Sequence, residues 1–155
     1  MTIAFPDPDL RILARRADIL AGLAALVAPE ALIASEDERR AFETDGLTAY
    51  RRMPLAVVLP SSTAEVSAVL AYLNREGVKV VPRGAGTSLA GGAIPQEDAV
   101  VVGIAKMNRL LDLDIPNRTA RVEAGITNLG ISAAVRQNSA PGFGRRGAAE
   151  VVRSP

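Results

Sequence analysis

The sequence contains no cysteine and no histidine, and its 155 residues include three phenylalanines, two tyrosines and no tryptophan. Without cysteine no disulfide bond can form. Zinc sites built from thiolates or imidazoles are excluded as well, as is catalysis by Ser-His-Asp or Cys-His arrangements. A general base within these residues would have to be a carboxylate, a lysine or a tyrosine. The scarcity of aromatic side chains predicts a core of closely packed aliphatic residues.

Neither sign of charge dominates the sequence, since 18 lysines and arginines stand against 17 acidic residues, giving a formal net charge of +1. Basic pairs such as Arg39-Arg40 lie among acidic residues, and we interpret them as solvated faces. No excess of cations is available to neutralise a phosphate backbone. We therefore expect no nucleic-acid partner.

Long hydrophobic runs are also missing. The longest, Ile19 to Pro29, has 11 residues and is too short to span a bilayer. The first residues, MTIAFPDPDLRILARR, lack the basic segment and apolar run of a signal peptide. The sequence therefore predicts a cytoplasmic protein without a membrane span.

Residues 1–50 are predicted to form a helical lead with no chemistry of its own. Apolar side chains recur there at helical spacing, with residue types that begin and end helices at the expected places. The expected elements are a helix over residues 9–27 that Asp9 caps and Pro29 stops, and a short helix over 37–44 that ends at the turn signal Asp45-Gly46.

Two strands with a helix between them predict a βαβ unit in the next part of the chain. L-A-V-V-L at 55–59 is a short apolar run closed by Pro60, as in a buried strand. S-T-A-E at 62–65 has the form of a capping box, in which hydroxyl and carboxylate reciprocally satisfy free amides. Gly77 can end that helix, and a second strand follows over 78–81. The crossover should be right-handed.

Beyond a long glycine-rich loop, the pattern predicts strands over 100–104 and 120–124 and a final helix from Thr127 to about Gln137. Residues 138–155 have no sustained period and are interpreted as an irregular or disordered tail. The fold class is thus α+β, with a small mixed sheet over residues 51–137 preceded by N-terminal helices. The remaining polar and aromatic side chains are interpreted as surface residues (Lys106, Arg109, Asp112, Asp114) or packing residues (Tyr50, Tyr72).

The loop after the second strand carries the chemistry. V-P-R-G-A-G-T-S-L-A-G-G, residues 81–92, places four glycines in nine positions and adds two hydroxyls and Arg83. Consecutive amides in such a loop can converge on an anion, most plausibly a phosphate. The alternatives are a long loop whose glycines serve only tight turns, and an Arg83 that is a surface ion-pair partner.

Two familiar phosphate loops do not match. A P-loop needs G-x-x-x-x-G-K-[ST], yet no lysine lies between Lys79 and Lys106. The dinucleotide fingerprint G-x-G-x-x-G would start at Gly84, but Leu89 occupies the position of its third glycine. That motif also opens a helix, whereas this loop leads into a strand. We therefore expect an anion-binding loop in a fold other than the Rossmann fold.

These segments resemble a known family. VVPRGAGTSLAGGA, preceded by AVVLPSSTAEVSAVL and followed by ARVEAGITNLGIS, is similar to the FAD-binding, PCMH-type domain of the vanillyl-alcohol oxidase flavoproteins. The flavin subunit of glycolate oxidase and the D-lactate dehydrogenases form the most similar branch, which ETDGLTAYRRMPLAVVLP at 43–60 also resembles. The resemblance covers roughly residues 10 to 135.

The resemblance implies a first flavin-binding subdomain whose glycine loop binds the FAD pyrophosphate. Because the chain has no histidine or cysteine for a covalent link, it implies noncovalent FAD. Carried over by position, the expected FAD contacts, made chiefly through backbone amides, are Pro82, Arg83, Gly84, Ala85, Gly86, Thr87, Ser88, Leu89, Gly91 and Gly92. Leu89 is expected to pack its side chain.

The sequence departs from that branch after its T-N-L-G-I-S segment. Related proteins continue with segments like Y-A-P-D-P-S-S and T-I-G-G-N, which hold the rest of FAD, whereas this chain has RQNSAPGFGR at 136–145. The second flavin half and the substrate cap domain are therefore expected to be absent, as in a frameshifted or truncated gene product.

Three functions remain open. The first is the FAD-binding portion of a 2-hydroxy-acid oxidoreductase, completed by other oxidase subunits or by self-association. The second is a stand-alone phosphate- or nucleotide-binding module, and the third is an inactive fragment of the oxidoreductase. No catalytic residue and no metal ligand is assigned.

Overall fold

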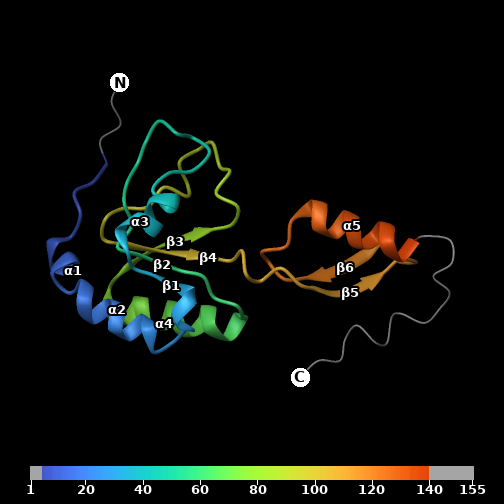
Figure 1. Ribbon diagram of the computed structural model, residues 1–155, viewed down its shortest axis with the longest axis horizontal. Helices are drawn as coiled ribbons and strands as arrows, with labels where there is room; N and C mark the ends of the chain where they lie inside the picture. Colours follow the sequence, from blue (N-terminus) through green and yellow to red (C-terminus); the bar gives the residue numbers. More distant parts are fainter. Residues whose placement is uncertain (1–4, 140–155) are drawn as a thin grey trace. The chain divides into compact units, whose positions relative to one another are not determined.

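The computed structural model describes residues 5–139 (Figure 1). The described chain divides into two compact units, with the division between Ile104 and Ala105. The first unit contains a mixed sheet with helices, and the second contains an antiparallel pair of strands with one helix. This arrangement confirms the α+β class. No helix in residues 5–139 is long and apolar enough to cross a membrane.

The sheet of the first unit is mixed, and the order of its strands is β1-β2-β4-β3. β2 and β3 both run parallel to β4, whereas β1 is antiparallel to β2. The predicted βαβ strands are therefore parallel but not adjacent, because β4 lies between them. The strands are β1 (Leu32–Ile33), β2 (Ala56–Val58), β3 (Lys79–Arg83) and β4 (Ala99–Gly103). β1 was not predicted, because its two residues are too few for a periodic signal.

Helix α4 (Thr63–Glu76) connects β2 to β3 and is capped at both ends. The Ser62 hydroxyl accepts a hydrogen bond from the Glu65 amide at 3.2 Å, as predicted. The reciprocal bond is different, because the Glu65 carboxylate accepts from the amide of Ser61 at 2.8 Å and not from that of Ser62. Gly77 ends the helix in the left-handed conformation, with φ of 70°.

The helix expected over residues 9–27 is two shorter helices, α1 (Leu10–Ala14) and α2 (Arg16–Ala24). The Arg15 amide bonds to the Ile12 carbonyl at 3.1 Å, an i to i−3 contact that tightens the chain where the two helices meet. Asp9 caps α1 as predicted, by accepting from the Arg11 amide. Further along, the predicted helix over 37–44 is α3 (Glu36–Arg39) followed by a 3-10 turn, η2 (Arg40–Phe42).

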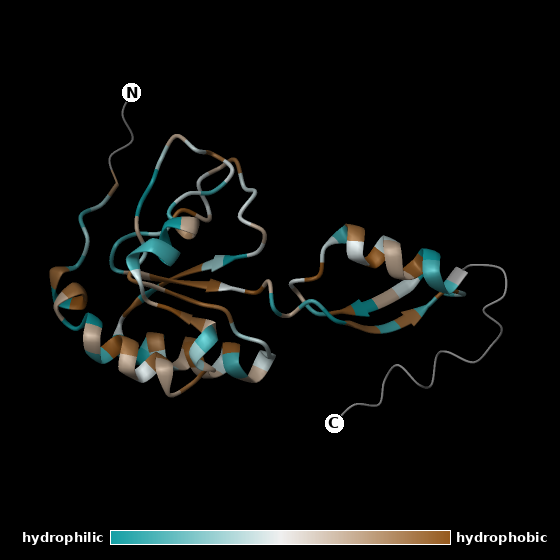
Figure 2. Ribbon diagram, viewed as in Figure 1, coloured by the Kyte–Doolittle hydropathy of each residue, from teal (hydrophilic) through white to brown (hydrophobic). Residues whose placement is uncertain are grey.

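The core of the first unit lies between the sheet and the helices α2 and α4, which cover one face of it (Figure 1). β2 and β4 are buried along their whole length, and Figure 2 shows them as apolar. From the helices, Ile19, Leu23, Val69 and Leu73 are fully buried. Aliphatic side chains therefore make the core, as the scarcity of aromatic residues predicted.

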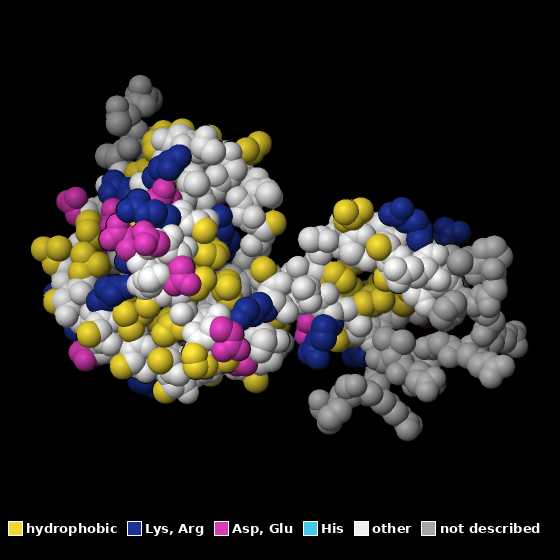
Figure 3. Space-filling view, viewed as in Figure 1, with side chains coloured by type: hydrophobic (Ala, Val, Ile, Leu, Met, Phe, Trp, Pro, Cys, Tyr) yellow, Lys and Arg dark blue, Asp and Glu magenta, His cyan; other side chains and the backbone are white. Residues whose placement is uncertain are grey.

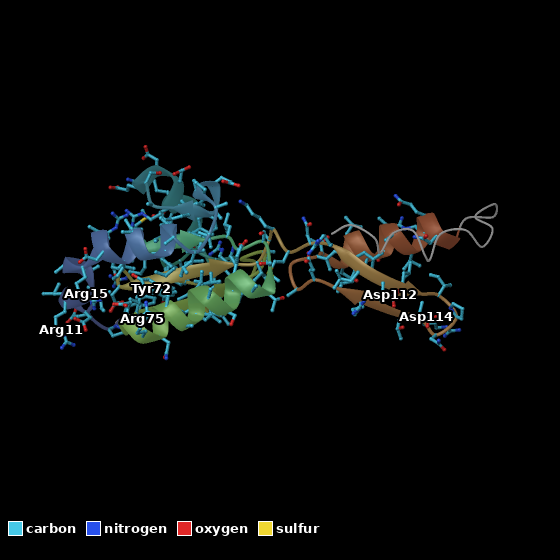
Figure 4. All side chains as sticks on the ribbon, turned by 90° about the horizontal axis from the view of Figure 1, so that it is seen from below. Arg11, Arg15, Tyr72, Arg75, Asp112 and Asp114 are labelled. Carbon is cyan, nitrogen blue, oxygen red and sulfur yellow. The ribbon has the colours of Figure 1, made fainter. Side chains whose placement is uncertain are left out.

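Tyr72 fills the space where α2 and α4 meet, which fits its predicted packing role. Its hydroxyl donates to backbone carbonyls of α2, and a Cβ added to Gly22 would lie 2.1 Å from that oxygen. Arg75 lies over its ring, 5.2 Å from the centroid, and Arg15 pairs with Glu76 beside it (Figure 4). The absence of a side chain at Gly22 is what lets the two helices pack around the tyrosine.

The second unit contains β5 (Leu110–Asp114), β6 (Thr119–Val122) and α5 (Asn128–Ser139). Thr127 caps α5 as predicted, since its hydroxyl accepts from the Gly130 amide at 3.1 Å. β6 was predicted and β5 was not, because the acidic residues in L-L-D-L-D mask the pairing of β5 with β6. The irregular tail predicted over 138–155 lies, from residue 140 onward, outside the described residues.

Candidate anion-binding loop

The glycine-rich loop leaves the sheet at Arg83, the last residue of β3, and covers residues 84–92. Gly86 and Gly91 have φ of 71° and 77°, in the left-handed region that other residues avoid. Gly84 and Gly92 do not, and the space where a Cβ would lie at each is open. Two glycines therefore shape the backbone, and the other two keep its surface unobstructed.

The backbone amides of this loop are largely unused by the protein. Within the described residues, the amides from Gly84 to Leu89 donate no hydrogen bond to a protein acceptor. The amide of Ala90 donates to the Ser88 hydroxyl at 3.2 Å, and that of Ile94 to the Gly91 carbonyl at 3.1 Å. A row of free donors that includes a left-handed residue is the arrangement that binds anions through the backbone.

The side chains of the loop are mostly exposed. Thr87 is exposed, whereas Ser88 is half-buried and its hydroxyl already accepts from the Ala90 amide. Leu89 is 74% exposed, so the expectation that its side chain packs is wrong within the described residues. Pro82 and Ala85 are exposed too. In Figure 3 the visible face of the first unit shows basic and acidic side chains intermixed, as the balanced composition indicated.

Arg83 is not a surface ion-pair partner within the described residues. Its Nη1 donates to the carbonyl of Thr44 at 2.7 Å and to that of Ala93 at 3.3 Å. The guanidinium lies 5.5 Å from the centroid of the Phe42 ring, and it makes no ion pair among the described residues. Burial lowers the pKa of Arg83, and the negative charge of Asp45 acts in the opposite direction. The side chain is thus engaged inside the unit.

A second segment, residues 43–47, packs against the loop and was missed as part of the site. The Leu47 amide donates to the carbonyl of Ser88 at 3.2 Å. A Cβ added to Gly46 would lie 2.9 Å from the carbonyl oxygens of both Thr87 and Ser88. In the sequence, Asp45-Gly46 is recognisable only as a turn signal, and no local pattern reveals that the turn contacts residues 41 positions later.

Asp45 is the buried carboxylate of this segment, with 4% of its surface exposed. Its Oδ1 accepts from the Leu47 amide at 2.9 Å, which closes the turn. Its Oδ2 is buried without a hydrogen-bond partner among the described residues. A buried carboxylate of this kind needs a nearby positive charge, and Arg83 supplies one.

The carboxylates of the second unit form no comparable site. Glu123, which is 9% exposed, accepts from the Arg109 guanidinium at 2.7 Å and from its amide at 2.9 Å. Asp112 is exposed, and Asp114 is half-buried and accepts from the Asn117 side chain at 2.6 Å. No group of acidic side chains that could hold a metal ion occurs among residues 5–139. The hydrogen bonds of Glu123 and Asp114 lie within the second unit and stabilise the hairpin.

The first unit has an α+β fold whose mixed sheet leads into a loop of free amides, an arrangement suited to binding an anionic group. Residues 54–149 match the family model described as "FAD binding domain". The match covers more than half of the chain, so the chain belongs to this family of FAD-binding domains. FAD contains a pyrophosphate, the kind of group that such a loop accommodates.

Among known proteins, this chain is similar in sequence to oxidoreductases that act on hydroxy acids. The chain is 42% identical over 132 residues to glycolate oxidase subunit GlcD of Escherichia coli, a match that covers 85% of this chain and 25% of the relative. It is 36% identical to GlcD of Bacillus subtilis over 118 residues, 76% of the chain and 25% of the relative. D-lactate dehydrogenase of Archaeoglobus fulgidus is 42% identical over 92 residues, 59% of the chain and 20% of that protein. The chain thus spans about a quarter of the length of these relatives.

Solved structures of flavoproteins share the fold. 4-Ethylphenol oxidase from Gulosibacter chungangensis superposes with a TM-score of 0.73 at 22% identity, covering 87% of this chain and 26% of that one. p-Cresol methylhydroxylase superposes with a TM-score of 0.71 at 20% identity, covering 81% and 25%. The fold is therefore one that these flavoproteins share over about a quarter of their length, as the sequence resemblance implied.

Proposed function

We propose that this chain is the FAD-binding portion of a flavin-dependent 2-hydroxy-acid oxidoreductase of the glycolate oxidase and D-lactate dehydrogenase kind. The identity to the relatives named above supports the branch. The observation that carries the proposal is the row of amides from Gly84 to Leu89, which has no protein acceptor in residues 5–139 and follows directly on β3.

The geometry of the loop is better explained by pyrophosphate binding than by a role as a surface turn alone. Two open glycine positions let phosphate oxygens approach the backbone closely, and each amide that donates to an ionised oxygen contributes about 1.5–3 kcal/mol. The chain holds the cofactor mainly through these amides, with the Thr87 hydroxyl as a further donor. The residues proposed to surround the pyrophosphate are Pro82, Arg83, Gly84, Ala85, Gly86, Thr87, Ser88, Leu89, Gly91 and Gly92.

The bound flavin would supply redox chemistry, accepting a hydride from the carbon that carries the hydroxyl of the substrate. The chain's own contribution is to bind and orient the cofactor without a covalent bond, because it has no histidine or cysteine to attach it. We assign no catalytic residue. The substrate site and the remaining flavin contacts would come from outside these residues, from other oxidase subunits or from further copies of the chain.

Titration of the purified chain with FAD, followed by flavin fluorescence, tests this function. The decisive variant is Gly86→Arg, because a Cβ at residue 86 would lie 2.3 Å from the Arg83 guanidinium and φ there is 71°. Ser67→Arg is the matched control, since Ser67 is exposed on α4 and lies outside the loop. We expect saturable binding that pyrophosphate displaces, retained by Ser67→Arg and lost in Gly86→Arg, with circular dichroism showing that the helices and the sheet of Gly86→Arg are still folded.

Two outcomes would contradict the proposal. If the wild-type chain does not bind FAD at any concentration reached, these residues do not hold the cofactor without the rest of the oxidoreductase. If Gly86→Arg binds FAD as tightly as the wild-type chain, the cofactor does not use the loop. Binding of pyrophosphate or ADP without FAD would instead favour a stand-alone phosphate-binding module.

A further inference from the structure

Arg83 connects three segments that are far apart in the sequence. Its backbone belongs to the end of β3, where its carbonyl accepts from the Ile104 amide at 3.0 Å. Its Nη1 reaches the carbonyl of Thr44 in the 43–47 segment and that of Ala93 at the exit of the glycine loop. One side chain therefore links the sheet, the second segment and the far end of the loop, which lie side by side in Figure 1.

The surroundings of the guanidinium compensate for its partial burial. The face of the Phe42 ring lies 5.5 Å away, within the range of a cation–π contact. Asp45, which is buried in the same segment as Thr44, supplies a negative charge that favours the charged form. The two hydrogen bonds to Thr44 and Ala93 and the contact with the Phe42 ring hold the side chain in one place, unlike that of a solvent-exposed arginine.

The glycine loop passes directly over this side chain. A Cβ added to Gly86 would lie 2.3 Å from Nη2 and 2.5 Å from Cζ of Arg83. Residue 86 is therefore a glycine for two reasons, its left-handed φ and the guanidinium beneath it. The curvature of the loop and the position of Arg83 depend on each other.

We propose that Arg83 is a positioning residue, which shapes the loop through the carbonyls of Thr44 and Ala93 and leaves the binding of phosphate to the backbone amides. Its part in cofactor binding rests on the proposed function, whereas its part in the loop does not. Nη1 of Arg83 is used inside the protein, and in this proposal the side chain is not itself a ligand of the pyrophosphate.

Hydrogen exchange measured by NMR without FAD tests the loop. The main reporter is the amide of Ile94, which is bonded to Gly91; the amide of Leu47 is a second reporter, bonded both to Ser88 and to the Asp45 carboxylate. We expect Arg83→Ala to speed their exchange about tenfold or more, the effect of losing hydrogen bonds from a charged donor, with little change in the β2 and β4 amides. Unchanged exchange at Leu47 and Ile94 would overturn the proposal, whether or not the chain binds FAD.

A double-mutant cycle tests the contact between Arg83 and Gly86. Gly86→Ala should destabilise the wild-type chain more than it destabilises the Arg83→Ala variant, because the guanidinium that its Cβ would meet is then gone. The residual effect in Arg83→Ala reports the left-handed backbone. Additive effects would contradict the dependence of one residue on the other.

The salt dependence of FAD binding separates positioning from direct phosphate contact. If Arg83 acts through the loop, Arg83→Ala weakens binding but leaves the slope of log Kd against log salt unchanged, and Arg83→Lys does not restore full affinity. If the guanidinium contacts phosphate, the slope falls with the lost charge and Arg83→Lys recovers it. A wild-type chain that binds no FAD would contradict the proposed function alone, because the exchange experiment judges the role of Arg83 independently.

Discussion

The sheet of the first unit and the loops beyond its strand ends are held together by different forces. β2 and β4 are buried at every residue, and the core around them is aliphatic. In the loops, polar bonds predominate: Arg83 to Thr44 and Ala93, and Leu47 to Ser88. The sheet is thus fixed by burial, which many residues share, whereas the geometry of the loop depends on a few individual contacts. Single substitutions should therefore affect stability in the first region and cofactor binding in the second.

The largest effect on stability is expected from Leu73→Ala on the buried face of α4. Leu73 is fully buried in the core cluster, and removing its side chain leaves a cavity that lowers the free energy of unfolding by about 2–5 kcal/mol. Leu70→Ala is the matched control from the same helix, since Leu70 is 41% exposed and should cost less than about 1 kcal/mol. Denaturant unfolding followed by circular dichroism measures both. Similar losses would show that α4 does not pack by the face described.

A smaller effect on stability, but a larger one on cofactor binding, is expected from Gly46→Ala. The added Cβ would meet the carbonyl oxygens of Thr87 and Ser88 at 2.9 Å, so the two segments must move apart. We expect a loss of about 1–3 kcal/mol in the free energy of unfolding, as for overpacking elsewhere, together with weaker FAD binding. Gly84→Ala, beside open space, should change the free energy of unfolding by little. If the two variants behave alike, the 43–47 segment does not support the loop.

The same contrast explains what the sequence could predict. β2, β4 and α4 follow from apolar runs, a capping serine and a glycine at the helix end, all of which are local signals. The glycine-rich loop could be predicted as a site because its glycines and hydroxyls lie close together in the sequence. Its support was not found, since the bonds from Arg83 to Thr44 and from Leu47 to Ser88 span about 40 residues and depend on how the sheet brings the segments together.

Misses in detail have physical causes of the same kind. The acidic residues of β5 disguise a strand whose partner, β6, becomes evident only when the hairpin is paired. The break between α1 and α2 at Arg15 follows from a single tightened hydrogen bond. The glutamate of the predicted capping box accepts from the amide of Ser61 and not from that of Ser62. Such choices between neighbouring partners differ little in energy, so residue type and spacing do not decide them.

The smallest effect concerns the second unit, where the buried carboxylate of Glu123 pairs with the largely exposed side chain of Arg109 at the end of the β5–β6 hairpin. Hydrogen bonds from the side chain and the amide of Arg109 lower the pKa of Glu123 below its ordinary value of 4.5. A carboxyl whose pKa is lower in the folded state stabilises the fold above its unfolded pKa and loses that contribution as the pH falls through the folded value. Unfolding of the hairpin, followed by NMR between pH 7 and pH 2, should therefore show stability falling below about pH 4.5.

Glu123→Gln keeps the shape of the side chain but removes its charge, so it should lower the stability at neutral pH and flatten this acid dependence. Asp112→Asn is the matched control from β5, because Asp112 is exposed and makes no ion pair among residues 5–139 (Figure 4). It should leave the acid dependence of the hairpin as in the wild-type chain. An unaltered acid dependence in Glu123→Gln would show that the pair with Arg109 adds nothing to the stability of the hairpin, and that polar contacts decide geometry only in the loops of the first unit.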